Sequence, residues 1–216
     1  LARDGWDLIF SYRRNQEHAA ALAEKLREKG SNVELRQLDL PDGDPGSFQG
    51  VDALVFAAGA DIEQPYISEA DPAALQSALD LEVRGFFNIV KAALPDLRES
   101  QGSVVVLSSA GLGRFPPGDI LSVAPKAAVE AIVKGLAREE GRYGVRANAL
   151  AVGVVDGGIF QRIDWKPETL EAMKKNIPLR RFAEPSELAE VVAFLVSHQA
   201  GYVTGQTLFV DGGYSL

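Results

Sequence analysis

The sequence contains no cysteine, which excludes disulfide bonds and thiolate chemistry. This absence fits a reducing compartment, so we expect a cytoplasmic protein. The only two histidines, His18 and His198, lack the spacing of metal ligands, and no metal site is expected. No apolar run approaches the roughly 18 residues of a membrane span, and we identify no signal peptide. We therefore expect no membrane partner.

Positive charge is also scarce, with 22 basic residues against 30 acidic ones and a formal net charge of −8. This acidic balance argues against a nucleic-acid-binding surface. A hydrophobic content of 46% and a charged content of 24% are typical of a globular protein, and 216 residues suit one domain, 1–216. The opening residues 1–6 have the pattern of a helix end, a glycine stop and a strand entry, so we expect residues before Leu1 to be missing.

Hydrophobic periodicity predicts an alternation of strands and helices along the whole chain. Strands are predicted at 6–11, 33–38, 52–57, 104–107, 145–151 and 205–213. Helices are predicted at 16–29, from 72 onward, at 127–142, 167–176 and 187–196, and a turn-rich connection at 41–50. This order predicts an α/β fold of the Rossmann type, a doubly wound and mostly parallel sheet with helices on both faces.

The stretch 103–126 combines a buried strand with polar residues that follow it. Four aliphatic residues lead into Ser108 and Ser109, a Gly/Pro-rich loop, and then Lys126 at the start of a long apolar-striped segment. Small polar residues at the carboxyl end of a strand lie where open α/β sheets bind ligands. Ordinary capping of the strand end by the two serines remains an alternative.

This stretch resembles the active-site strand and helix of the short-chain dehydrogenase/reductase family. Two further blocks carry the resemblance, AREEGRYGVRAN at 137–148 and the segment 184–213, which contains EPSELAEVVAFLVS and YVTGQTLFVDGG. The resemblance covers nearly the whole chain and is strongest to members such as 3-oxoacyl-acyl-carrier-protein reductase. It implies a Rossmann-type fold whose first strand and glycine-rich turn are absent from this sequence.

The resemblance implies a nicotinamide cofactor. Arg13 and Arg14 follow the first predicted strand, where arginines pair with the 2′-phosphate of NADP and an acidic residue would favour NAD. NADP is therefore expected over NAD, although a solvated arginine pair is the alternative. Asp39 matches an adenine-contacting aspartate, or it only initiates a turn. Ala58 and Gly59 retain half of a cofactor-binding turn.

The resemblance also implies catalytic positions. Ser109 matches the serine that steadies the substrate oxygen, and Lys126 matches the lysine that holds the nicotinamide ribose and lowers the pKa of a catalytic tyrosine. Ser122 stands where that tyrosine is expected, and Glu82 stands at an asparagine position. A serine hydroxyl is a far weaker acid than a phenol, whose pKa is about 10. Gly153 is the remaining expected cofactor contact.

Pro125 predicts that the following helix begins near this residue, because proline is favoured at the first helical position and disfavoured inside a helix. Residues 119–124 are then expected to form a loop. Three side chains become candidates to replace the tyrosine: Asp119, Glu82 and Tyr66. Without a tyrosine, Lys126 is either catalytic or only a ribose-binding or surface residue.

Two functions follow from these observations. One is an NADP-dependent oxidoreductase acting on a small carbonyl or alcohol, and the other is a catalytically silent relative that binds a nucleotide, a ligand or a partner protein. The loop 152–166 with Ile159, Phe160, Ile163 and Trp165 corresponds to a substrate lid and suggests an apolar substrate. The resemblance further implies a homodimer or homotetramer.

Overall fold

The computed structural model describes residues 1–59, 63–158 and 160–216 and divides into two compact units. The units comprise Leu1–Ser47 and Phe48–Leu216. Ile159 of the predicted lid lies outside the described residues. All pairs of neighbouring strands in both units are parallel, as the alternation of strands and helices predicted.

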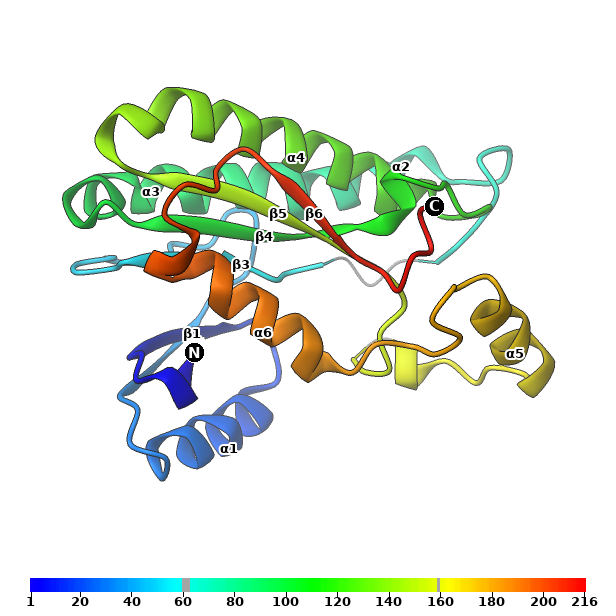
Figure 1. Ribbon diagram of the computed structural model, residues 1–216, viewed down its shortest axis with the longest axis horizontal. Coiled ribbons are helices and arrows are strands. Elements are labelled where there is room, and N and C mark those ends of the chain that lie inside the picture. Colours follow the sequence, from blue (N-terminus) through cyan, green and yellow to red (C-terminus); the bar gives the residue numbers. More distant parts are fainter. Residues whose placement is uncertain (60–62, 159) are drawn as a thin grey trace. The chain divides into compact units, whose positions relative to one another are not determined.

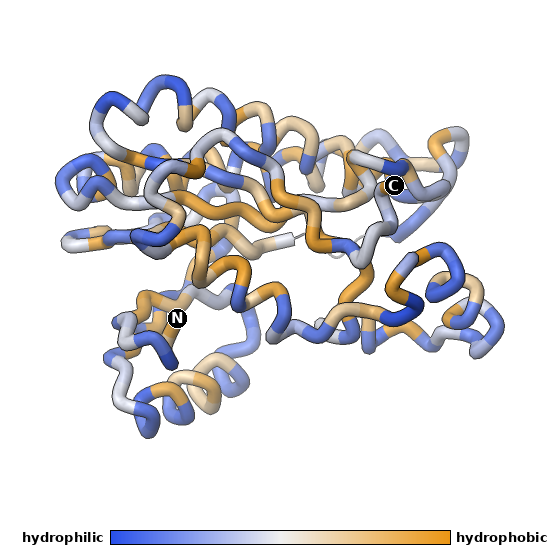
Figure 2. Tube along the Cα trace, viewed as in Figure 1, coloured by the Kyte–Doolittle hydropathy of each residue, from blue (hydrophilic) through white to orange (hydrophobic). Residues whose placement is uncertain are grey.

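The larger unit contains a four-stranded sheet in the order β3-β4-β5-β6. Its strands are β3 (Ala53–Phe56), β4 (Ser103–Ser109), β5 (Arg146–Val152) and β6 (Thr207–Val210). The two central strands, β4 and β5, are buried along most of their length, as continuous aliphatic runs require when both faces of a sheet are covered. Hydrophobic residues accordingly follow these strands in Figure 2.

Helices cover both faces of this sheet (Figure 1). One face carries α3 (Gly85–Ser100) and α4 (Ile120–Glu140), and the other carries α6 (Pro185–Val196). Helix α2 (Pro72–Leu79) begins with Asp71 as its N-cap and Pro72 at its first position, which confirms the predicted start. Helix α5 (Pro167–Lys175) follows the loop after β5.

A π-helical turn at Asp80–Arg84 joins α2 to α3, so that the chain is helical from Pro72 to Ser100. The hydrophobic period predicted the helix but not this turn. Single π-helical turns inside α-helices are rare and frequent at functional sites.

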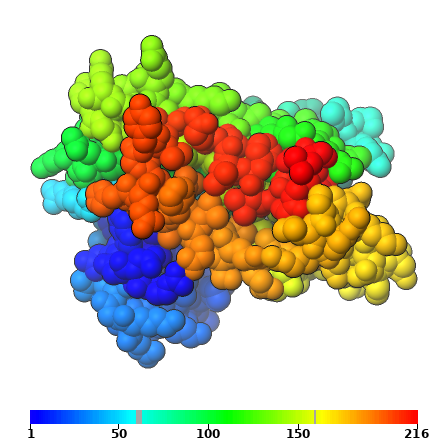
Figure 3. Space-filling model, viewed as in Figure 1, coloured from blue at the N-terminus to red at the C-terminus, as the bar shows by residue number. Residues whose placement is uncertain are grey.

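Strand β6 forms one edge of the sheet and exposes two apolar side chains, Leu208 and Phe209, at about two-fifths of their surface. The space-filling view shows the residues near the C-terminus in red, on the surface next to the orange residues of α6 (Figure 3). The sheet therefore offers an apolar edge at this side of the larger unit.

The smaller unit pairs β1 (Leu8–Tyr12) with β2 (Val33–Gln37) and packs α1 (Gln16–Arg27) against them. Asn15 caps α1 by accepting a hydrogen bond from the backbone amide of His18, and the helix begins at Gln16, where its start is predicted. Residues 41–50 form no helix or strand, also as predicted.

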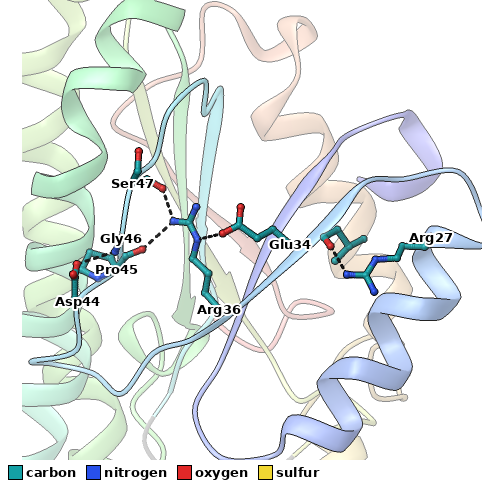
Figure 4. Close-up of polar contacts among 8 residues, drawn as sticks. Arg27, Glu34, Arg36, Asp44, Pro45, Gly46 and Ser47 are labelled. Carbon is teal, nitrogen blue, oxygen red and sulfur yellow. Dashed lines mark hydrogen bonds and ion pairs between the residues drawn. The ribbon is translucent and has the colours of Figure 1, made fainter.

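A single arginine organises the connection that follows β2. The guanidinium of Arg36 donates to the carbonyls of Pro45 at 2.9 Å and Ser47 at 2.5 Å and pairs with Glu34 (Figure 4). Asp44 accepts a hydrogen bond from the Gly46 amide in the same turn. These bonds satisfy backbone groups that a helix would otherwise pair, which explains how an aperiodic segment holds one conformation.

Candidate active site

Lys126 lies on α4 and reaches the carboxyl end of β4. Its Nζ donates a hydrogen bond to the carbonyl oxygen of Leu107 at 2.9 Å, and it forms an ion pair with Oε2 of Glu82 at 2.9 Å. Both side chains are buried, with 11% of Lys126 and 3% of Glu82 exposed. Such a pair is costly to break, because one partner would be left as a buried and uncompensated charge.

Glu82 belongs to the π-helical turn, which packs against α4. Gly59, in the segment after β3, lies near the same carboxylate, because a Cβ atom added to it would lie 4.0 Å from Oε1 of Glu82. The fold therefore brings Gly59, Glu82 and Lys126 together at the carboxyl ends of β3 and β4. The sequence pattern identified each of these positions but did not predict the ion pair.

The two serines at the end of β4 have different partners. Ser108 is buried and donates to Oε1 of Glu130 at 2.5 Å, while Oε2 of Glu130 accepts from Thr207 at 2.9 Å. Ser109 accepts a hydrogen bond from the amide of Gly111 at 3.1 Å and so caps a short 3₁₀ turn. Ser109 keeps its hydroxyl proton available for a ligand, because only the oxygen is used by the cap.

The predicted start of the helix at Pro125 is wrong. Helix α4 begins at Ile120, and the backbone carbonyl of Asp119 accepts hydrogen bonds from the backbone amides of Ser122 at 3.2 Å and Val123 at 2.9 Å. Proline inside a helix costs about 3 kcal/mol. The first turn, however, buries Leu121 and Val123, and full burial of one such side chain contributes about 1.5–3 kcal/mol. Packing therefore outweighs the loss of one backbone hydrogen bond.

This start places Asp119, Ser122 and Lys126 at positions i, i+3 and i+7, which share one face of α4. Ser122 is partly buried, and its hydroxyl makes no polar contact within the described part of the chain. Tyr66, the third candidate to replace the tyrosine that the resemblance implies, is 62% exposed. Its backbone carbonyl forms a turn by accepting from Glu69 and Ala70.

Asp119 is the N-cap residue of α4, but its side chain does not cap the helix. Oδ1 instead accepts a hydrogen bond from Nε2 of Gln64 at 3.4 Å. Burial raises the pKa of Asp119, the bond from Gln64 opposes this shift, and the negative charge of Glu82 raises the pKa further. The sequence contained no signal for Gln64, because its contact depends on how the segment after β3 lies against α4.

Gly118 determines how closely the segment that contains Gln64 approaches the start of α4. Its φ of +83° is typical of glycine, and an added Cβ would lie 2.8 Å from the backbone oxygen of Gln64. The close approach brings the amide of Gln64 within reach of Asp119.

Gly153 follows β5, where an added Cβ would lie 2.6 Å from the Cα of Asp211. A glycine is therefore required here by packing against the turn after β6. The predicted role of Gly153 in cofactor binding stays a prediction.

The lid residues Phe160 and Trp165 stack on each other with ring centroids 5.3 Å apart, and Phe182 contacts Phe160 at 4.9 Å. Nε1 of Trp165 donates to the carbonyl of Phe160 at 3.0 Å. Ile163 is 44% exposed. The loop after β5 therefore holds an aromatic cluster of its own.

In the smaller unit, Arg13 and Asp39 form an ion pair, with Nε of Arg13 2.5 Å from Oδ1 of Asp39. Gln37 donates to the carbonyl of Arg13 at 3.2 Å. The guanidinium of Arg14 is exposed and has no polar partner among the residues described. Two residues predicted to bind the cofactor thus bind each other, and Arg14 is left for an anion.

Each unit taken by itself offers a cationic group to a ligand. In the smaller unit, the exposed guanidinium of Arg14 matches phosphate geometry. In the larger unit, the ammonium of Lys126 donates to the carbonyl of Leu107 and forms the ion pair with Glu82. Among the described residues, no group of three or more histidine and acidic side chains could hold a metal ion. In the same part of the chain, no helix is long and apolar enough to cross a membrane.

Comparison with known proteins gives consistent matches over the whole chain. A family model described as "Enoyl-(Acyl carrier protein) reductase" matches residues 1–215. An uncharacterized oxidoreductase, YmfI, of Bacillus subtilis (strain 168) is 35% identical over 99% of this chain and 90% of the relative. The 3-oxoacyl-[acyl-carrier-protein] reductase FabG of Staphylococcus aureus (strain Mu50) is 31% identical over 99% and 89%.

Solved structures agree with these matches. A short-chain dehydrogenase/reductase from Serratia marcescens superposes with a TM-score of 0.89 at 27% identity, covering 100% of this chain and 90% of that one. A blue fluorescent protein from a metagenomic library, in complex with NADPH, also gives 0.89, at 28% identity and the same coverage. The predicted fold is thereby confirmed.

Proposed function

Since this chain belongs to the short-chain dehydrogenase/reductase family, we propose that it is an NADP(H)-dependent oxidoreductase acting on a small, apolar carbonyl or alcohol. We further propose that both compact units belong to one domain, because the family model matches residues 1–215. The cysteine-free sequence supports a cytoplasmic location.

The observation that carries this proposal is the position of Lys126. Its ammonium is held at the carboxyl end of β4 by the carbonyl of Leu107 and the carboxylate of Glu82, where it could donate to a ribose hydroxyl of the cofactor. Ser109 lies at the end of the same strand, with a hydroxyl proton available for a substrate oxygen. When bound, the reduced cofactor supplies two electrons and one hydrogen to the carbonyl carbon.

The preference for NADP over NAD rests on Arg14. Its free guanidinium suits the 2′-phosphate, whereas Arg13 is already paired with Asp39. The acidic residue that would favour NAD is expected at the same position, where this chain carries Arg13 and Arg14.

The test is a calorimetric titration of the purified protein with NADPH and with NADH. A hydrogen-bonded charge contributes about 1.5–3 kcal/mol, so Arg14→Ala is expected to weaken NADPH binding roughly 10- to 100-fold and to leave NADH binding unchanged. Arg3→Ala removes another exposed arginine and serves as the matched control. Equal affinity of Arg14→Ala and the unaltered protein for NADPH would contradict this assignment.

The aromatic cluster of Phe160, Trp165 and Phe182 supports an apolar substrate, because it forms an apolar wall within the loop region after β5. A 3-oxoacyl thioester is the first substrate to test, since one relative is a 3-oxoacyl-[acyl-carrier-protein] reductase. Absence of turnover with this thioester and with simple aromatic and aliphatic ketones would argue against the substrate class.

A second candidate function is that of a catalytically silent member of the family that binds a nucleotide or a partner. Two observations favour it: Ser122 has no phenol to offer, and the charge of Lys126 is compensated by Glu82. Tight NADPH binding without turnover of any carbonyl would support this alternative, and failure to bind either nucleotide would exclude the oxidoreductase.

We also propose a homodimer or homotetramer. The exposed side chains of Leu208 and Phe209 on the edge strand β6, with Phe194 on α6 40% exposed, supply apolar surface for a second copy. Light scattering at micromolar concentration should give at least twice the mass of one chain, and a monomer would contradict the proposal.

A further inference from the structure

The site lacks the tyrosine of its family, but its carboxylates and its lysine are arranged so that another group can hold a proton. Asp119, Ser122 and Lys126 share one face of α4, and Glu82 faces α4 from the π-helical turn. The hydroxyl of Ser122 is far too weak an acid to replace a phenol. A proton donor must therefore come from elsewhere on this face or from the segment that covers it.

In this site, the positive charge of Lys126 is compensated by the carboxylate of Glu82. A lysine that is not paired lowers the pKa of an acidic neighbour, because its positive charge favours the anion. Here Glu82 lies 2.9 Å from the ammonium of Lys126 and cancels that charge. This pair therefore gives a neighbouring carboxyl group less drive to ionise than an unpaired lysine would.

The contacts of Asp119 make it the candidate for this proton donor. Its side chain is not used to cap α4 and does not form an ion pair within the described residues. It faces Gln64, whose backbone is held against Gly118. The negative charge of Glu82, which carries Lys126 as its counter-ion, also acts on Asp119.

We propose that Asp119, rather than Ser122, donates the proton to the substrate oxygen during carbonyl reduction, an inference that rests on the oxidoreductase function proposed above. The O–H bond of the Asp119 carboxyl breaks and an O–H bond forms on the substrate oxygen, while the C=O π bond is lost. The two electrons and the hydrogen at carbon come from the reduced nicotinamide, which is oxidised. The Asp119 carboxylate then takes up a proton from water.

Electrostatics supports this assignment. Burial raises the pKa of Asp119, the hydrogen bond from Gln64 lowers it in part, and the charge of Glu82 raises it again. A general acid is most effective when its pKa lies near the working pH, and a raised carboxyl pKa moves in that direction. In this proposal, Glu82 compensates the charge of Lys126, and Asp119 takes over the role of the tyrosine at whose position Ser122 stands.

The first experiment measures the proton on Asp119 without nucleotide or substrate. Infrared difference spectra of unaltered protein and Asp119→Asn, recorded across pH, isolate the C=O band of the protonated Asp119 carboxyl. We expect this band to persist to higher pH than in an ordinary aspartate and to disappear at lower pH in Glu82→Gln. Asp71→Asn is the matched control, because Asp71 is an exposed N-cap on α2 and asparagine caps equally well. A band that titrates as an ordinary aspartate would overturn the inference.

The second experiment measures NADPH-dependent reduction of the N-acetylcysteamine thioester of acetoacetate. General acids contribute roughly 100- to 10,000-fold, so Asp119→Asn should lose at least about 100-fold in kcat. Its NADPH affinity should be unchanged. Activity of the unaltered protein should fall about tenfold per pH unit above the pKa of Asp119, and Asp119→Glu should restore activity with a shifted profile.

The outcomes separate the two proposals. If the unaltered protein neither binds NADPH nor reduces the thioester, the proposed function fails and the inference fails with it. If it does both, and Asp119→Asn keeps the same kcat and pH profile, the inference alone is overturned. A large loss in Ser122→Ala with no loss in Asp119→Asn would assign the role to Ser122 instead.

Discussion

The buried pair between Lys126 and Glu82 makes a quantitative prediction about stability. Replacing Lys126 by methionine keeps the length and the apolar stem of the side chain but removes the ammonium. Because only 3% of Glu82 is exposed, water cannot solvate the carboxylate left behind. Breaking such a pair costs about 3–5 kcal/mol. In a chain of 216 residues, each 1 kcal/mol lowers Tm by roughly 2–4 °C, which gives a fall of about 6–20 °C.

The assay is urea unfolding followed by circular dichroism, performed on Lys126→Met, Glu82→Gln and the double variant. The double variant removes both charges, so it should be more stable than the sum of the single losses predicts, with a coupling free energy of at least about 1–3 kcal/mol. Lys174→Met is the control, because Lys174 pairs with Glu171 at 3.1 Å on the exposed surface of α5 and such pairs contribute at most about 1 kcal/mol.

Additive losses in the double variant would refute the reasoning, because they would mean that the two side chains do not interact in the folded protein. A loss below about 1 kcal/mol in Lys126→Met would do the same, since it would show that water reaches Glu82. Equal losses in Lys126→Met and Lys174→Met would indicate that burial does not matter to this pair.

Two further predictions concern a surface ion pair and two glycines. Arg181, together with the backbone amide of Glu184, lowers the pKa of Glu187 to about 2. These contacts contribute stability that is present above the pKa of an unfolded glutamate and is lost as pH falls toward 2. In Arg181→Met, carbon-13 NMR titration should show a higher Glu187 pKa, and an unchanged value would contradict the pairing. Gly153→Ala should lose about 1–3 kcal/mol in urea unfolding, because its Cβ would clash with the backbone of Asp211. Gly59→Ala should lose much less, because its Cβ would lie at an ordinary contact distance of 4.0 Å from Oε1 of Glu82. Equal losses would show that the backbone after β5 moves to accept the methyl group.

Local patterns predicted most of the secondary structure, because strands and helices follow from side chains a few residues apart. The aliphatic run of β4 and the Asp71–Pro72 start of α2 are examples, and both are confirmed. The start of α4 is the opposite case. Pro125 favours a helix start by its own geometry, but burial of the turn before it is a property of the packed core, which a local pattern does not contain.

The sequence by itself determined the family, the parallel α/β fold and the positions at which catalytic side chains are expected. These depend on hydrophobic period, turn residues and motif spacing, all of which can be identified along the chain. Only the tertiary structure decided what those side chains do to one another: that Glu82 compensates Lys126, that Asp119 is held by Gln64, and that Arg13 is paired with Asp39. Charge pairing and desolvation act through space between residues far apart in sequence, and their strength depends on burial, which exists only once the chain is folded.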